Sequence, residues 1–308
     1  MGVRRICVAV IGFVLTTLVM ASTAETQPAE STRLRISYGK ESTSFGKLLL
    51  PVGTGPFPVA VLVHGGCWKS TAGSIASMRP IAEMLLEHGV ASWNVEYRRV
   101  GHAGGGWPGT FRDLSDAVDY LRKLVDNHPI DVSRIVVAGH SSGGHFAAWL
   151  AVRSRLPKGT PLTSAAPLPI SGVVAIDAFV DPLVIDSTGV DGELYCGEPI
   201  LERLVGGDPS VETDQLRQIS PLEMLPWGVP QAYVVSSKRY PVVPARPLAD
   251  GRTTMQVADY PALARAAGDD ISVQVIPEAG HFDFLDPTTA AGWAVERAIL
   301  RVVESIGE

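Results

Sequence analysis

The stretch that decides the fold is "RIVVAGHSSGGHFAAWLAV", residues 134 to 152. A continuous apolar run such as "RIVVAG" is typical of a strand buried on both faces, and the segment after it has helical composition. Between them lies Gly139-His140-Ser141-Ser142-Gly143. A nucleophile on a tight strand-to-helix turn needs small residues two positions to either side, because its backbone is strained there. The pattern therefore predicts Ser141 as a nucleophile projecting above a sheet.

Further apolar runs of strand length lie on both sides of this stretch and alternate with amphipathic segments of helical length. Such alternation predicts a mostly parallel sheet with helices on both faces. The expected strands are residues 34–39, 47–51, 58–66, 90–97, 134–141, 171–176, 231–236 and 271–276, and the expected helices are 75–88, 111–126, 142–155, 256–267 and 288–306. Residues 180–228 contain no strong strand and are rich in Asp, Gly and Pro, which favours a cap-like excursion over the sheet.

Two loops after expected strands supply the partners that a serine nucleophile needs. "HGGCW", residues 64 to 68, follows an early strand, and glycines there let backbone N–H groups approach a developing oxyanion. The candidate donors are Gly66 or Cys67, together with Ser142 after the nucleophile. "EAGHFDF" places His281 on a loop after the last strand, where a histidine can act as general base.

The ordered set "HGGCW", "NVEYRRVGHAGGGWPGTFRDLSDAVDYL", "GHSSGGH", "ISPLEMLPWGVP" and "GHFDFLDP" resembles the α/β-hydrolase superfamily. Within it, residues 35–306 look like the small His-Gly-Gly esterase-type members, which include feruloyl and acetylxylan esterase-like proteins and kynurenine formamidases. The resemblance implies an α/β-hydrolase fold with an eight-stranded sheet. It also implies Ser141 as nucleophile, His281 as base and an oxyanion hole from Gly66, Cys67 and Ser142.

The acid of the triad is where the chain departs from that family. The resemblance places it after the strand 231–236, where Tyr240 occupies the aspartate position. A tyrosine cannot supply the fixed charge that stabilises an imidazolium. Asp250 in the same interval is the first candidate for a displaced acid. Asp177, directly after the strand 171–176, is the second, with Asp181 a weaker neighbour; the remaining alternative is that no acid works.

These residues predict an exported serine hydrolase that cleaves carboxylic esters through an acyl-enzyme, without cofactor or metal. The expected substrate is a small-molecule or polysaccharide-linked ester. Two alternatives stay open: a degenerate α/β-hydrolase that serves as a binding module, and an amidase or formamidase. Arg98, Arg99, Asp113 and Asp116 are interpreted as a scaffold ion-pair cluster, because no reaction step calls for them.

The N-terminal segment and the net charge limit where the protein is expected to act and which partners it is expected to bind. Residues 1–24 carry Arg4 and Arg5, an apolar stretch and a small-residue site ending at Ala24, which predicts a signal peptide, followed by a flexible segment at 25–33. The expected location is periplasmic or secreted, with no stable membrane insertion after cleavage and 34–308 as the hydrolase domain. The formal charge of −6 argues against nucleic acid as a partner.

Cys67 and Cys196 are the cysteines that remain once Cys7 leaves with the signal peptide. In an oxidising compartment an even pair is compatible with a disulfide, but spacing alone does not bring two Cα atoms within reach. Two buried thiols are the alternative.

Overall fold

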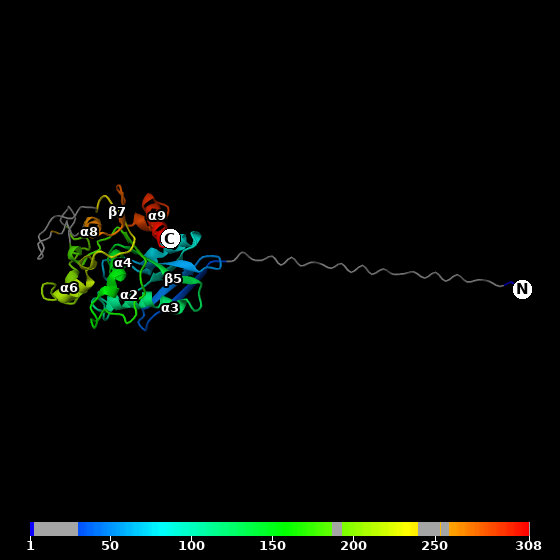
Figure 1. The fold of residues 1–308 in the computed structure, drawn as a ribbon, viewed down its shortest axis with the longest axis horizontal. Coiled ribbons are helices and arrows are strands. Elements are labelled where there is room, and N and C mark those ends of the chain that lie inside the picture. Colours follow the sequence, from blue (N-terminus) through cyan, green and yellow to red (C-terminus); the bar gives the residue numbers. More distant parts are fainter. Residues whose placement is uncertain (3–29, 187–192, 240–252, 254–258, 308) are drawn as a thin grey trace.

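The computed structural model describes residues 1–2, 30–186, 193–239, 253 and 259–307. Figure 1 shows those residues in colour along the chain. The predicted signal peptide, apart from its first two residues, and most of the segment 25–33 lie outside the described residues. So does the interval that contains Tyr240 and Asp250.

The core of the protein is an eight-stranded sheet with the order β1-β2-β4-β3-β5-β6-β7-β8. The strands β1 and β2 are antiparallel to their neighbours, whereas β3 to β8 pair in parallel with one another. All eight strands coincide with predicted runs, which confirms the predicted sheet. Their bounds are β1 Thr32–Ser37, β2 Phe45–Leu50, β3 Phe57–Val63, β4 Ala91–Val95, β5 Ile130–His140, β6 Gly172–Ile176, β7 Gln231–Ser236 and β8 Ile271–Ile276.

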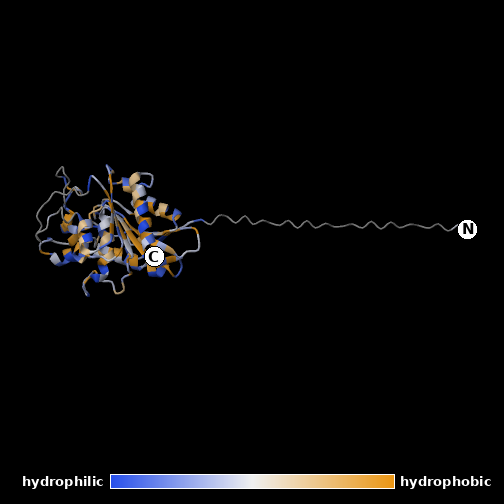
Figure 2. Ribbon diagram, turned by 45° about the horizontal axis from the view of Figure 1, so that its top comes forward, coloured by the Kyte–Doolittle hydropathy of each residue, from blue (hydrophilic) through white to orange (hydrophobic). Residues whose placement is uncertain are grey.

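Helices cover both faces of this sheet (Figure 1). Alternate residues of β3 show why: Val59, Val61 and Val63 pack into one apolar cluster, while Ala60 and Leu62 pack into the other. The first cluster includes residues of α2 (Gly109–Asp119), α3 (Leu121–Leu124), α4 (Ser142–Val152) and α8 (Tyr260–Ala267). The second includes residues of α1 (Arg79–Glu87) and α9 (Ala290–Ser305). The apolar strands therefore lie between two helical layers, as Figure 2 shows by colour.

The helix α4 is apolar on all sides, and ten of its eleven residues are buried. A helix of this kind needs cover on every face. The sheet covers one side. The chain between β6 and β7 covers another, since Ile219 and Leu222 share the apolar cluster of α4.

That chain between β6 and β7 contains the described part of the predicted excursion. It holds α5 (Leu201–Val205), α6 (Thr213–Ile219) and the 3-10 turns η3 (Pro182–Val184) and η4 (Pro221–Met224). Its buried residues join the larger of the two apolar clusters. It therefore packs on the main core and does not build a separate one from its described residues.

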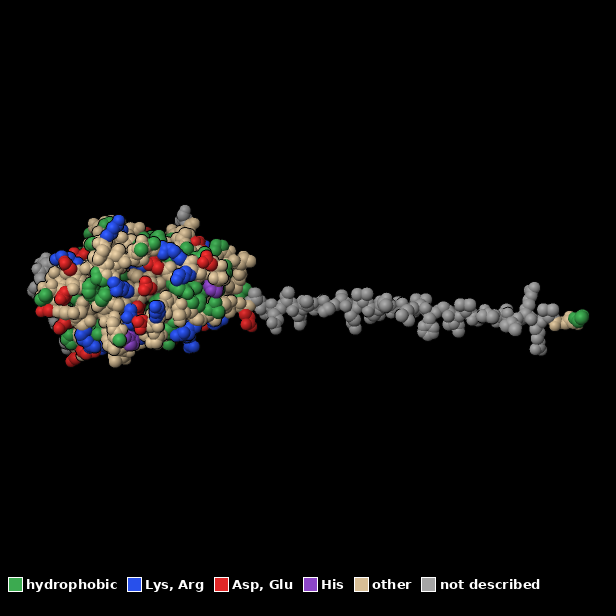
Figure 3. All heavy atoms as spheres, turned by 90° about the horizontal axis from the view of Figure 1, so that it is seen from below, with side chains coloured by type: hydrophobic (Ala, Val, Ile, Leu, Met, Phe, Trp, Pro, Cys, Tyr) green, Lys and Arg blue, Asp and Glu red, His purple; other side chains and the backbone are tan. Residues whose placement is uncertain are grey.

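The surface carries mixed charge on the face shown in Figure 3, where Lys and Arg side chains lie among Asp and Glu side chains. Among the helices of the described ranges, none has the length and apolar content needed to cross a membrane.

Candidate active site

Ser141 occupies the turn between β5 and α4, with φ 55° and ψ −123°. This left-handed φ is unfavourable for a residue with a side chain, and such strain is typical of functional sites. The two flanking positions must be glycine, because no Cβ fits at either of them. A Cβ at Gly139 would lie 2.0 Å from the Gly143 carbonyl oxygen, and one at Gly143 would lie 2.1 Å from that of Val63. The structure therefore has the predicted turn geometry, with Ser141 at its tip.

The parallel strands bring the other predicted residues to the same edge. The register pairs Val63 of β3 with Gly139, and Ile276 of β8 with Ser236, so the loops after these strands start at one level. A cavity of about 290 Å³ lies at this edge. It is lined by Gly66, Cys67, Ser141, Ser142 and His281, among others. The cavity thus brings together every predicted site residue except Asp250, which lies outside the described residues.

The carboxylate that holds His281 is that of Asp177. His281 Nδ1 lies 2.5 Å from Asp177 Oδ2, and the Asp177 side chain is almost fully buried. Asp177 Oδ1 accepts a hydrogen bond from the Ser236 backbone N–H at 3.0 Å. Nδ1 of a histidine can donate only one hydrogen bond, and Asp177 accepts it. Of the two candidate acids, the second, Asp177, is therefore the one that the described residues place against His281, while Asp250, the first candidate, lies outside the described residues.

The electrostatics of this pair suit a neutral base beside a charged acid. Burial would raise the pKa of Asp177, but the hydrogen bond from His281 and the charge of Arg239 lower it below its usual value. Burial lowers the pKa of His281 more than the bond to Asp177 raises it. With Nδ1 donating to Asp177, Nε2 is the ring nitrogen left to accept a proton. His281 is then available as a base near neutral pH.

The loop after β3 is held in an unusual backbone conformation. Gly66 has φ 130°, and a Cβ there would lie 2.0 Å from the Ala72 carbonyl oxygen, while Cys67 and Trp68 have φ 51° and 57°. Trp68 Nε1 donates to His145 Nδ1 at 3.2 Å. A loop fixed in this way keeps its backbone N–H groups in place without reorganisation during a reaction.

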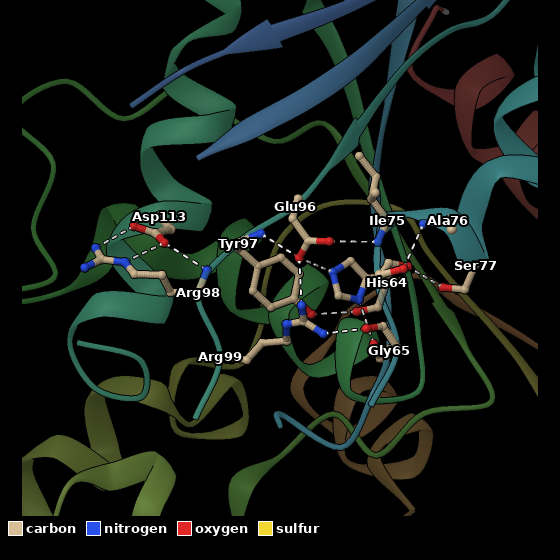
Figure 4. Close-up of polar contacts among 12 residues, drawn as sticks. His64, Gly65, Ile75, Ala76, Ser77, Glu96, Tyr97, Arg98, Arg99 and Asp113 are labelled. Atoms are coloured by element: carbon tan, nitrogen blue, oxygen red, sulfur yellow. Dashed lines mark hydrogen bonds and ion pairs between the residues drawn. The ribbon is translucent and has the colours of Figure 1, made fainter. Parts of the chain in front are cut away.

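Figure 4 shows a polar network beneath this loop, around Glu96. Glu96 Oε1 lies 3.0 Å from His64 Nε2 and 3.1 Å from Arg99 Nη2, and Oε2 accepts from Ile75 N. Arg99 Nη1 in turn donates to the carbonyl oxygen of Gly73 at 2.6 Å. Burial would raise the pKa of Glu96, but its bonds and the charges of His64 and Arg99 lower it to about 2. Glu96 is therefore an anion that ties the loop to β4.

Two further histidines near Ser141 hold backbone segments in place through their rings. His140 Nε2 lies 2.9 Å from the His281 carbonyl oxygen, and burial together with the His281 charge lowers its pKa to about 3. The neutral His140 ring donates this bond and fixes the loop of the base. His145 Nε2 bonds the Ile219 carbonyl oxygen at 2.7 Å, and burial lowers its pKa to about 4.

The sequence alone did not point to Glu96, and it grouped Arg99 with Asp113 and Asp116. Arg98 does pair with Asp113, at 2.7 Å between Nη2 and Oδ1, but Arg99 pairs with Glu96. The available signal was a carboxylate near the end of the expected strand "VASWNVEY". Arg239, another residue lining the cavity, was also missed, because it lies within the interval where an acid was expected.

Of the two alternatives for the cysteines, the structure contains the disulfide. Cys67 and Cys196 are bonded across 129 positions of sequence, with their Cα atoms 5.6 Å apart. The bond joins the loop after β3 to the excursion between β6 and β7, and both residues line the cavity. The cross-link therefore connects two walls of the site.

Cys196→Ser is expected to lower both stability and activity. Loss of a cross-link that closes so long a loop costs about 2–5 kcal/mol of unfolding free energy. The Cys67 segment also loses its anchor, so kcat/KM for an ester is expected to fall by up to about 100-fold, the cost of one misplaced oxyanion donor. Urea unfolding and ester hydrolysis, each with and without dithiothreitol, measure this. Reductant is expected to bring the wild type to the level of the variant and to leave the variant unchanged. Full activity of wild-type protein whose two cysteines titrate as free thiols would contradict this prediction.

A strained serine at the strand-to-helix turn of a sheet with this order, with a histidine after its last strand, defines the α/β-hydrolase superfamily. The chain belongs to the BD-FAE family, whose pattern matches residues 48–247. The matched range contains the loop after β3, Ser141 and Asp177, and it ends before His281.

Individual proteins with similar sequence or structure carry esterase names. Over 250 residues the chain is 24% identical to esterase LipC of Mycobacterium tuberculosis, covering 76% of this chain and 55% of that protein. The chain spans about half the length of the curated relatives that it matches. The structure of esterase B from Lactobacillus Rhamnosis matches 91% of this chain and 87% of its own, with a TM-score of 0.68 and 15% identity. A bacterial heroin esterase matches 92% and 86%, with a TM-score of 0.64 and 21% identity.

Proposed function

We propose that this protein hydrolyses carboxylic esters through an acyl-enzyme intermediate. The observation that carries the proposal is the bond between His281 Nδ1 and the buried Asp177 carboxylate, in a cavity that Ser141 also lines. A histidine held in this way keeps Nε2 free to take a proton from a serine. The esterase name of LipC supports the same reaction class.

The proposed reaction has two steps that use only residues of this chain. Ser141 Oγ attacks the ester carbonyl carbon while its proton moves to His281 Nε2. The oxyanion accepts hydrogen bonds from the backbone N–H groups of Ser142 and of Cys67 or Gly66. The tetrahedral intermediate then collapses, and the leaving alcohol takes the proton. Water attacks the acyl-enzyme, again giving a proton to His281, and the carboxylic acid leaves when Ser141 regains its proton.

The cavity favours a small acyl or alcohol group as substrate. Its volume of about 290 Å³ lies at the lower end for ligand sites, and Phe179, Ile185, Phe282 and Leu285 give it apolar walls. The exposed Phe282, 71% accessible, stands beside the base. A small-molecule ester or a short acyl group linked to a polysaccharide fits this description.

We also propose that the protein is exported to the periplasm or the exterior. The charged, apolar and small-residue regions of residues 1–24 support export, since this order is typical of a signal peptide. The Cys67–Cys196 bond supports it independently, because disulfides persist mainly in oxidising compartments.

The experiment is hydrolysis of p-nitrophenyl acetate by the purified protein, with fluorophosphonate labelling of Ser141. We expect turnover and labelling of the folded protein. Because burial lowers the pKa of His281 from its usual value, the fall of kcat/KM on the acid side is expected at a lower pH than an unperturbed histidine would give. A folded protein that is neither labelled nor active would favour the binding-module hypothesis. Turnover of an aryl formamide at a higher kcat/KM than the ester would favour the formamidase.

A further inference from the structure

An arginine side chain lies in the candidate active site. Arg239 follows β7, and it lines the same cavity as Ser141 and His281. Its side chain is only 16% exposed. A buried guanidinium in a small and largely apolar cavity is costly unless it is paired. The partners of Arg239 therefore decide what it does there.

Within the described part of the chain, Arg239 has incomplete pairing. Its Nε lies 3.4 Å from Asp177 Oδ2, the oxygen that already accepts the bond from His281. Its guanidinium carbon lies 4.8 Å from the ring centroid of Tyr195 and 5.3 Å from that of Phe179. Such cation–π contacts orient the guanidinium but use none of its N–H donors. No hydrogen bond to either Nη group is found among the described residues.

The described charges around His281 also favour the binding of an anion. Among the described residues, Asp177 is the carboxylate that both His281 and Arg239 contact. When His281 takes the proton of the serine, two of the described side chains are cations and only Asp177 among their described partners is an anion. Lys69, the cation of the adjacent loop, is engaged by Glu198 at 3.0 Å and the Cys196 carbonyl oxygen at 2.9 Å. Among the described residues, Arg239 is thus the cation of this cavity whose Nη donors have no recorded partner.

We propose that Arg239 binds an anionic group of the substrate, so that the enzyme prefers esters that carry a carboxylate over neutral esters of the same size. The two Nη groups form a planar fork that matches both oxygens of a carboxylate. This assignment rests on the ester hydrolase function proposed above. The carboxylate belongs either to the acyl part or to the alcohol part of the ester, and the experiment distinguishes the two.

The test compares two matched substrate pairs in the wild type and in Arg239→Gln. Mono-4-nitrophenyl succinate against its methyl ester places the carboxylate on the acyl part, and 4-acetoxybenzoate against its methyl ester places it on the alcohol part. In at least one pair, we expect the ratio of kcat/KM for the anionic over the neutral ester to fall roughly 10- to 100-fold in the variant, as loss of a charged hydrogen bond implies. The effect is expected mainly in KM, with uncatalysed hydrolysis subtracted.

Two variants serve as controls for charge and for geometry. Lys238→Gln removes the same charge one residue away, from a side chain that is 57% exposed and 3.5 Å from Glu278. It is expected to leave both ratios unchanged. Arg239→Lys keeps the charge but loses the fork, so an intermediate ratio is expected.

The ratio of kcat/KM for the anionic over the neutral ester distinguishes a role of Arg239 in substrate binding from an effect of Arg239 on His281. Arg239→Gln also changes the surroundings of Asp177, but that change affects both esters of a pair equally and cancels. An equal loss for anionic and neutral esters would overturn the assignment and make Arg239 a positioning residue only. Wild type that turns over none of the four esters would overturn the hydrolase proposal itself.

Inhibition of the wild type provides a measurement that needs no variant. If Arg239 binds carboxylate, glutarate is expected to inhibit hydrolysis of p-nitrophenyl acetate competitively, at least about 10-fold more strongly than glutaramide. Equal inhibition by the two compounds would contradict the proposal even where Arg239→Gln does not fold.

Discussion

Ser141→Ala is expected to lower kcat for p-nitrophenyl acetate by about 10⁴- to 10⁶-fold, the loss that follows removal of a nucleophilic serine. Covalent catalysis ends without the Oγ atom, whereas the oxyanion donors remain and sustain a slow residual rate above that of water. Stopped-time assays with product quantification measure this residual rate, and fluorophosphonate labelling is expected to disappear.

The variant is expected to fold like the wild type. The strain at Ser141 comes from a Cβ on a backbone with φ 55°, and alanine carries the same Cβ. Thermal unfolding is therefore expected to be unchanged. Ser133→Ala is the matched control, because Ser133 lies near the other end of the same strand, where its hydroxyl bonds Asp131 at 2.5 Å. Wild-type rates in Ser141→Ala would remove Ser141 from the mechanism.

The fold could be predicted from sequence because its signals are local. Continuous apolar runs mark the strands β3 to β7 directly, and the spaces at Gly139 and Gly143 explain why only that motif fits the turn. His281 was predictable from chain order, since it follows the last strand. These features depend on residues within a few positions of one another.

The choice between the candidate acids could not be made from sequence, because it depends on neighbouring strands. The strands β6 and β7 are adjacent and parallel, so a carboxylate after either one starts at the same edge, close to the loop of His281. Asp177 has φ 40°, and the sharp turn that this value implies is not encoded by any local motif. The disulfide and the contact between Arg99 and Glu96 likewise depend on tertiary packing.

Asp177→Asn is expected to lower kcat by about 10²- to 10⁴-fold near neutral pH, the range for loss of a triad carboxylate. Asparagine has the same shape but no charge, so it neither stabilises the imidazolium nor fixes the proton on Nδ1. The measurement is kcat for p-nitrophenyl acetate, with a low-field proton NMR signal of the His281 Nδ1–H as a second readout. That signal is expected in the wild type and is expected to be lost in Asp177→Asn.

Asp250→Asn is the control that separates the two candidate acids, because it makes the same chemical change at the position that the sequence favoured. It is expected to leave kcat and the low-field signal unchanged, since Nδ1 of His281 already donates to Asp177 at 2.5 Å. A large loss in Asp250→Asn with little change in Asp177→Asn would reverse the assignment. Small losses in both variants would mean that Ser141 and His281 work without an acid. A large loss in Asp177→Asn alone would explain how the chain tolerates Tyr240: the charge that the base needs comes from the end of β6, one strand earlier than the family pattern places it.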